Sequence, residues 1–284
     1  MDRPRAVARG VELFPARTPT LPPATHTNSY ALGTREVVLV EPATPYEDER
    51  RAWVEWARAI ESSGRRLVAL FLTHHHPDHV GGAAFLAAEL GLPVWAHPGT
   101  AVRTPGVAIA RTVVDGEDLV LDGPAAVRWR ALHTPGHAPG HLCLHDAEQG
   151  VIVCGDMVAS EGTILIDTVD GDMAEYLRQL ERLAALDARL ALPAHGEPID
   201  APSKLFRHYI AHRIAREAKV LAATRSASPE GAPAAALVPI AYADTSPLLW
   251  PIARLSLEAH LVKLEAEGRV RRTPAGWSVA DPRD

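Results

Sequence analysis

The hexapeptide His74-His75-His76-Pro77-Asp78-His79 follows directly on an apolar run, residues 67–72, with the sequence LVALFL. A short apolar run followed by polar residues predicts a buried β-strand, so the hexapeptide begins where that strand ends. Side chains two residues apart in an extended segment point the same way, so His74 and His76 can reach one metal ion. Asp78 and His79 come after Pro77, where the chain turns, and can reach a second ion. Imidazole and carboxylate groups suit zinc and similar first-row metals.

Three later segments repeat the pattern of a short strand, a glycine or proline, and then a residue type that binds metals. They contribute His137, Asp156 and His195. Strand ends and the loops after them are where sites are built on a rigid base. The recurrence makes the four segments together a much stronger indication of a metal site than any one of them.

In the rest of the chain, the pattern of apolar and polar residues predicts strands and helices in alternation. Short turn sequences between successive strands, typical of β-hairpins, are frequent. Strands are expected near residues 29–32, 35–40, 67–72, 92–96, 113–121, 127–132, 142–145, 151–154 and 190–192, and helices over 47–63, over 82–90 and from the N-cap Asp172. This mixture favours sheets covered by helices over a simple doubly wound parallel sheet.

The last eighty residues have a different pattern. Helices are expected over residues 204–224, 234–241 and 252–267, with a linker or loop over residues 226–233. Residues 269–279, RVRRTPAGWSV, predict a β-hairpin that turns at Pro-Ala-Gly. Helices followed by a basic hairpin resemble a winged helix, in which the hairpin is the wing.

The motifs HxHxDH, TPGH, GD and PAHG, in this order, resemble the metallo-β-lactamase superfamily, and the C-terminal winged helix resembles that of its lactamase-beta-2-like group. The resemblance implies an α+β fold: an αββα sandwich over residues 1–202, then a joining helix and a small winged-helix domain over residues 203–284. It also implies two metal ions per chain. The first would be held by His74, His76 and His137, the second by Asp78, His79 and His195, with Asp156 bridging both. Zinc is the expected metal, and manganese and iron also suit such a site.

The resemblance further implies a metal-dependent hydrolase. A hydroxide that bridges the two ions would attack an electrophilic carbon or phosphorus, and the ions would stabilise the developing oxyanion. Asp78 is the candidate catalytic residue, because its carboxylate can orient the nucleophile by accepting a hydrogen bond. Replacement of Asp156 or His76 by alanine is therefore expected to abolish both metal content and turnover.

The charge distribution bears on the substrate. Residues 203–284 carry 12 Lys and Arg against 8 Asp and Glu, a net of +4, which leaves −10 for the first 202 residues. An acidic catalytic domain repels a polyanion such as RNA. We therefore expect a thioester or ester of a small acyl compound as the substrate. The apolar residues 164–166 are candidates for an acyl slot, with an ordinary buried strand as the alternative.

Two other functions remain open from the sequence. Arg269, Arg271 and Arg272 on the wing favour a single-strand-specific endoribonuclease that hydrolyses RNA phosphodiesters. A nucleic-acid-binding regulator with a non-catalytic metal domain is the third alternative, which the complete ligand set disfavours.

The composition excludes several protein classes. Hydrophobic residues make up 47% of the chain, enough for a packed core, and no apolar stretch approaches the 18 residues of a membrane span. Two cysteines, Cys143 and Cys154, cannot form a disulfide framework, and residues 1–5 lack the apolar run of a secretory signal. We therefore expect a cytoplasmic protein without a membrane partner, and the sequence leaves a homodimer open.

Overall fold

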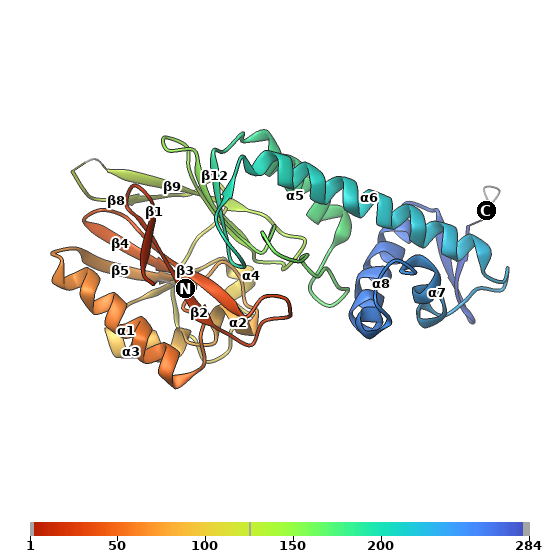
Figure 1. The fold of residues 1–284 in the computed structure, drawn as a ribbon, viewed down its shortest axis with the longest axis horizontal. Coiled ribbons are helices and arrows are strands. Elements are labelled where there is room, and N and C mark those ends of the chain that lie inside the picture. The colour runs from red at the N-terminus through yellow and green to blue at the C-terminus, as the bar shows by residue number, and fades with distance from the viewer. Residues whose placement is uncertain (1–2, 125, 281–284) are drawn as a thin grey trace.

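The computed structural model describes residues 3–124 and 126–280, which form a four-layer sandwich with a smaller helical unit at one end (Figure 1). Two sheets pack face to face, and helices cover the outer face of each sheet. The expected α+β architecture with αββα layers is confirmed.

The first sheet has seven strands in chain order. They are β1 (Arg5–Ala8), β2 (Val11–Arg17), β3 (His26–Leu32), β4 (Glu36–Val40), β5 (Arg66–Phe71), β6 (Val94–Ala96) and β7 (Ile109–Thr112). The first four are antiparallel neighbours, and β4 to β7 are parallel. The central strands are apolar on both faces, because Val38 and Phe71 face the second sheet while Leu39 and Leu70 pack beneath the outer helices. These helices include α1 (Glu47–Ser62) and α3 (Ala83–Leu90).

The second sheet has six strands. They are β8 (Asp118–Leu121), β9 (Val127–His133), β10 (Leu142–Asp146), β11 (Val151–Gly155), β12 (Leu190–Pro193) and β13 (Ile199–Asp200), in the spatial order β13-β12-β11-β10-β9-β8. Only β11 and β12 are parallel neighbours among the described strands of this sheet. Leu144 and Val153 face the first sheet, and Ile152 and Cys154 pack under α5 (Met173–Ala185). Asp172 is the N-cap of α5 as expected, since its side chain accepts a hydrogen bond from the Glu175 backbone nitrogen.

The C-terminal unit is built on one long helix, α6 (Pro202–Ser226). Phe206 and Tyr209 near its start pack beneath the second sheet, whereas Val220 and Leu221 near its end belong to the C-terminal core. The unit continues with α7 (Ala234–Ala241), the 3-10 turn η1 (Pro247–Leu249), α8 (Trp250–Ala266), β14 (Val270–Thr273) and β15 (Gly276–Val279). The last two strands form the expected antiparallel hairpin.

One expectation about the strands was wrong, and some strands were not expected. Residues 113–117 are not part of a strand, because the chain turns at Asp115 and Gly116 before β8 begins. The strand β7 lies just before this segment instead. The N-terminal strands β1 and β2 were not expected, since Pro4, Gly10 and Pro15 interrupt their sequence pattern.

Candidate metal centre

The predicted metal-ligand residues meet at one edge of the sandwich, where strands of both sheets end. Residues 74–79 follow β5 and lead into the short helix α2 (Pro77–Val80). Asp156 and His195 follow β11 and β12, which are parallel and therefore deliver both side chains to the same edge. His137 lies in the loop between β9 and β10. The site is therefore built at strand ends, as the sequence pattern predicts, and these strands belong to both sheets.

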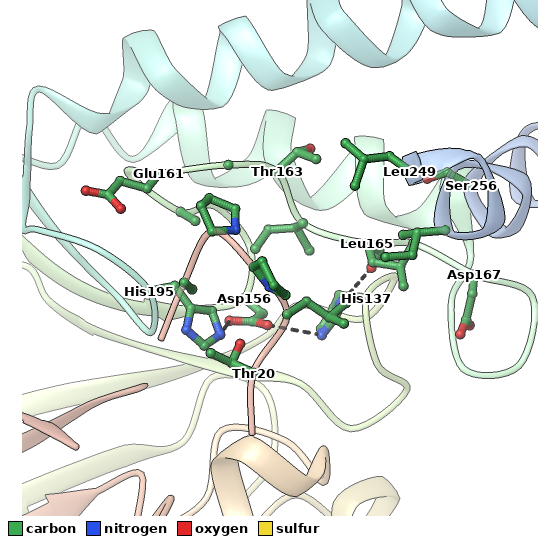
Figure 2. Close-up of a pocket in the computed structure, with 18 of the residues that line it drawn as sticks. Thr20, His137, Asp156, Glu161, Thr163, Leu165, Asp167, His195, Leu249 and Ser256 are labelled. Carbon is green, nitrogen blue, oxygen red and sulfur yellow. Dashed lines mark hydrogen bonds and ion pairs between the residues drawn. The ribbon is translucent and has the colours of Figure 1, made fainter. Parts of the chain in front are cut away.

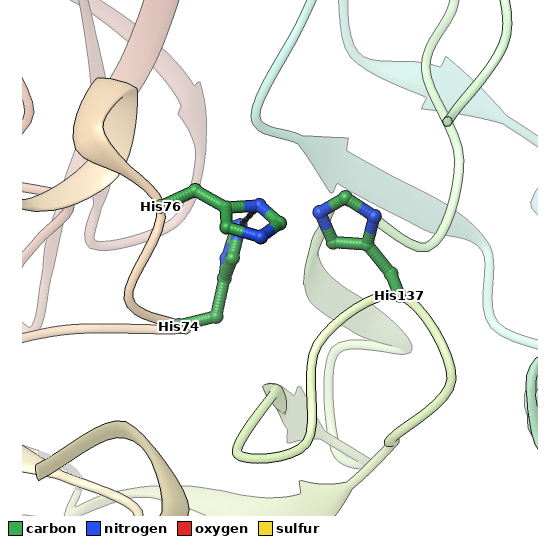
Figure 3. A group of neighbouring side chains, drawn as sticks. All are labelled: His74, His76 and His137. Carbon is green, nitrogen blue, oxygen red and sulfur yellow. Dashed lines mark hydrogen bonds between the residues drawn. The ribbon is translucent and has the colours of Figure 1, made fainter. Parts of the chain in front are cut away.

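Three imidazoles form the first group. His74 and His76 come from one loop and His137 from another, and the three rings converge (Figure 3). The Nε2 atom of His74 lies 3.1 Å from Nδ1 of His76. One nitrogen from each of the three residues lies within 4.8 Å of the others, which is close enough for one ion to contact all three.

Asp78, His79 and His195 form the second group, and one ligand atom from each lies within 4.8 Å of the others. Asp156 lies between the two groups. Its Oδ2 atom is 3.4 Å from Nε2 of His137 and 3.5 Å from Nε2 of His79, and its Oδ1 atom is 3.3 Å from Nε2 of His195. The structure thus brings together all seven residues in the two sets expected from the sequence.

Four of the five imidazoles have their second ring nitrogen engaged by another group. The Nδ1 atoms of His74, His79, His137 and His195 lie 2.6–3.0 Å from Thr73 Oγ1, Glu41 Oε2, the Leu165 carbonyl oxygen and the His26 carbonyl oxygen, respectively. Contacts of this kind fix the ring orientation of metal-binding histidines. Each of these rings is consequently held with Nε2 toward the centre.

The donor atoms at the centre fit divalent metal ions. The Nε2 atoms of His79 and His137 and the Oδ1 atom of Asp156 are buried and have no hydrogen-bond partner among the described residues. Unpaired buried polar atoms are rare in folded proteins, and cations at the two ion positions would satisfy all three. Burial lowers the pKa of His137 to about 4 and that of His74 well below its ordinary value, so both rings are neutral at pH 7, as a metal ligand must be.

Family comparison agrees with this geometry. The family model of the metallo-beta-lactamase superfamily matches residues 22–195, which include every residue of the centre. The chain belongs to the metallo-β-lactamase superfamily. It is a hydrolase of the metallo-β-lactamase fold, and its residues 234–277 match the beta-lactamase-associated winged helix domain.

Known metallo-β-lactamase-like proteins resemble the chain over most of its length. The Beta-lactamase-like protein 2 homolog of Drosophila melanogaster is 28% identical over 86% of this chain and 84% of its own length. The Atrochrysone carboxyl ACP thioesterase of Aspergillus chevalieri is 29% identical over 72% of this chain, and the match spans 63% of that relative. A crystal structure of a metallo-beta-lactamase family protein from Thermus thermophilus superposes with a TM-score of 0.78 at 27% identity, covering 96% of this chain and all of that one.

Glu41 contacts this candidate metal centre and was missed in the sequence. Its side chain is 1% exposed, and its Oε2 atom lies 2.6 Å from Nδ1 of His79. Its backbone φ of 60° is uncommon for a residue other than glycine, and such conformations cluster at functional sites. The available signal was its position directly after β4, which is the placement that singled out the ligand residues themselves.

Asp170 is a second residue that the sequence did not single out. Its Oδ2 atom lies 3.1 Å from Nε2 of His75 and 3.5 Å from Nε2 of His76. Asp170 therefore engages the outer nitrogen of the fifth ligand imidazole. His75 contacts the same carboxylate.

His141 contacts the backbone of the centre. Its Nε2 atom accepts a hydrogen bond from the Asp156 backbone nitrogen at 3.1 Å, and its Nδ1 atom lies 2.8 Å from Thr134 Oγ1. Burial holds the pKa of His141 well below its ordinary value, which keeps the ring neutral and able to accept. His141 therefore supports the backbone of a candidate ligand residue.

A cleft of about 690 Å³ opens onto the metallo-β-lactamase centre (Figure 2). Its floor carries Asp78, His137, Asp156 and His195, and its walls come from residues 19–24, residues 161–165 and the C-terminal unit. Residues 164–166 do not form a strand, and Ile164 and Leu165 line the cleft.

In the described part of the chain, no helix has the length and apolar character that spanning a bilayer requires.

Proposed function

We propose that this member of the metallo-β-lactamase superfamily hydrolyses thioesters or related esters of acyl compounds with a dinuclear zinc centre. The observation that carries the proposal is the cleft, whose largely apolar walls end at the candidate metal centre, five of whose seven candidate ligand residues line it. Binding sites for small organic molecules commonly have this form, a largely apolar pocket of 300–1,000 Å³ with a few convergent polar groups.

The chain would contribute the geometry of the reaction. Hydrolysis consumes one water, breaks the C–S bond of the thioester and forms a C–O bond, giving a carboxylate, a thiol and one released proton. Divalent ions in the two groups would lower the pKa of a water between them and stabilise the oxyanion that develops. The Oδ2 atom of Asp78 lies 3.6 Å from Nε2 of His195 at the cleft floor, where the carboxylate is placed to accept a hydrogen bond from the attacking water.

The relatives support an acyl substrate. One of them is named as a thioesterase acting on a carrier-protein thioester, and this chain spans 63% of its length. The acyl part of such a substrate requires an apolar surface next to the reacting carbonyl. Ile164 and Leu165 provide that surface beside His137, whose Nδ1 atom contacts the Leu165 carbonyl oxygen at 2.9 Å.

The contacts of the wing do not favour the ribonuclease alternative. Arg269 forms ion pairs with Glu217 and Glu267, and Arg272 forms one with Glu265. Basic side chains that pair with neighbouring carboxylates contribute less to phosphate binding than free ones do. Among the described residues, those of β14 and β15 do not line the cleft.

The experiment that tests the proposal compares the two substrate classes on the zinc-loaded protein. A panel of acyl-coenzyme A thioesters and a single-stranded RNA are assayed with the wild type, with Asp78→Ala and with Asp122→Ala, an exposed aspartate away from the cleft as a control. We expect thioester hydrolysis that Asp78→Ala abolishes and Asp122→Ala retains. Rapid RNA cleavage that depends on Asp78, with inert thioesters, would overturn the proposal.

A further inference from the structure

We propose that the winged-helix domain forms the outer part of the acyl-binding site, and that Leu249 and Ile252 set the preference for acyl-chain length. The inference rests on the proposed function and assigns the distal part of the acyl chain to a specific wall of the cleft.

The cleft extends from the centre to the C-terminal unit. In Figure 2, Leu165 lies between His137 and the helix that carries Ser256, with Leu249 on the same side as Ser256. Leu249 from η1 and Ile252 and Ala253 from α8 line this outer part. A substrate with its carbonyl at Asp156 would therefore meet Leu165 first and the winged-helix residues farther out.

The outer wall exposes large apolar side chains. Leu249 is 51% exposed and Ile252 is 38% exposed, and Leu21, from the N-terminal loop that also lines the cleft, is 51% exposed. Apolar side chains that gather around a concave site on a soluble protein mark a surface that an apolar ligand covers. Here they come from both domains, so one acyl chain would contact both.

The outer wall is held in a fixed position relative to the centre. Ser256 Oγ of α8 donates to the Ile166 carbonyl oxygen at 3.4 Å, and Ala259 of α8 packs with Ile166 in the core beneath the second sheet. Arg213 of α6 donates to the Ile164 carbonyl oxygen and, at 3.2 Å, to Thr163 Oγ1. Residues 163–166, which include Leu165, are thus joined to both α6 and α8. The distance from the centre to the outer wall is therefore fixed.

The charges near this wall favour a neutral chain over an anionic group. Arg216 lines the cleft, but its guanidinium pairs with Asp244 at 2.8 Å and with the Ala241 carbonyl oxygen at 2.6 Å. Arg213 is 3% exposed and donates to the groups described above. The most exposed cleft-lining side chains of η1 and α8 are the apolar Leu249 and Ile252, which suit the methylene groups of an acyl chain.

The test measures how hydrolysis depends on acyl-chain length. N-acetylcysteamine thioesters with acyl chains of four to twelve carbons are used, because all of them release the same uncharged thiol. The variants are Leu249→Ala and Ile252→Ala. The matched controls are Leu248→Ala, from the same turn but 89% exposed, and Val262→Ala, which is 39% exposed near the other end of α8; neither control residue lines the cleft.

We expect kcat/KM of the zinc-loaded wild type to rise by a factor of about four per added methylene until the cleft is filled. Leu249→Ala and Ile252→Ala should lose activity by a factor that grows with chain length and reaches about tenfold or more for the longest chains. The controls should keep the wild-type profile. Two results would overturn the inference while leaving thioester hydrolysis intact. One is a wild-type kcat/KM that does not change with acyl-chain length, and the other is that Leu249→Ala and Ile252→Ala depend on chain length as the wild type does.

Direct binding separates this inference from the proposed function. If no thioester of any length is hydrolysed, the proposed function fails, and binding of decanoate to the zinc-loaded protein is measured by calorimetry. Binding that weakens in Leu249→Ala and Ile252→Ala, but not in the two controls, supports an apolar chain site on the winged-helix domain. No binding, or binding that all four variants retain, overturns it.

Discussion

Glu41 and His79 form a buried pair in which Nδ1 of His79 lies 2.6 Å from the carboxylate of Glu41. The other carboxylate oxygen accepts a hydrogen bond from the Thr73 backbone nitrogen at 3.1 Å. A single side chain directly after β4 therefore orients one candidate ligand and also fixes the start of the loop that supplies three others. Burial alone would lower the pKa of His79, but the carboxylate of Glu41, followed by those of Asp156 and Asp78, raises it well above its ordinary value.

Replacement of Glu41 by glutamine should weaken metal binding about 10- to 100-fold. Glutamine keeps the size of the side chain, but its neutral amide holds the His79 Nδ1–H less strongly and no longer makes the imidazole a better ligand. Chelator competition with the purified protein measures the zinc affinity. The control is Glu148→Gln, which changes an exposed carboxylate paired with Arg9 and should bind zinc like the wild type. Wild-type affinity in Glu41→Gln would show that the buried pair does not support a metal site.

Replacement of Asp170 by alanine should also weaken zinc binding, but by about tenfold or less. The side chain of Asp170 is 22% exposed and lies 3.5 Å from Nε2 of His76, so it restrains that ring less than Glu41 restrains His79. The same competition assay gives the measurement. Arg103→Ala should show a smaller change in the same direction, because Arg103 Nε lies 3.6 Å from the Asp170 carboxylate. An unchanged affinity in Asp170→Ala would contradict a role in orienting His76.

Replacement of Glu217 by glutamine should destabilise the chain at neutral pH. Burial acts to raise the pKa of Glu217, but His260 and Lys263 lower it to about 2, and Lys263 Nζ donates to it at 2.7 Å. Because the folded pKa lies below the ordinary 4.5, the stabilisation is complete above pH 4.5 and is lost as the pH falls toward 2. We expect a loss of about 1–2 kcal/mol in the free energy of unfolding at pH 7. Urea denaturation at several pH values measures the free energy of unfolding of both proteins. The free energy lost in the variant should become smaller below pH 4.5, and a loss that stays constant with pH would contradict this account.

The strand-end pattern was enough to predict the seven candidate ligands because each signal is local. A buried strand such as β5 or β11 is recognisable from its apolar run, and the residue types that follow are uncommon at that position. The helices and the C-terminal hairpin follow from equally local patterns. The domain division at residue 202 stays a prediction, because α6 packs in both cores.

The supporting residues were not predictable because they act over long distances in the sequence. Glu41 meets His79 across 38 positions, and Asp170 meets His75 across 95. A single acidic residue after a strand, or in a loop, is ordinary until the fold shows which imidazole it contacts. The outer wall of the cleft likewise depends on how α8 packs against residues 163–166, which no local pattern records.

The most direct test of the central claim is the metal content of the purified chain after zinc reconstitution, measured by native mass spectrometry. The two groups of ligands joined by Asp156 predict two zinc ions per chain in the wild type. Asp156→Asn should bind fewer than two, because its neutral amide no longer offers a carboxylate oxygen to both groups. A wild-type chain that binds no zinc, or an Asp156→Asn variant that retains two ions, would contradict the dinuclear centre.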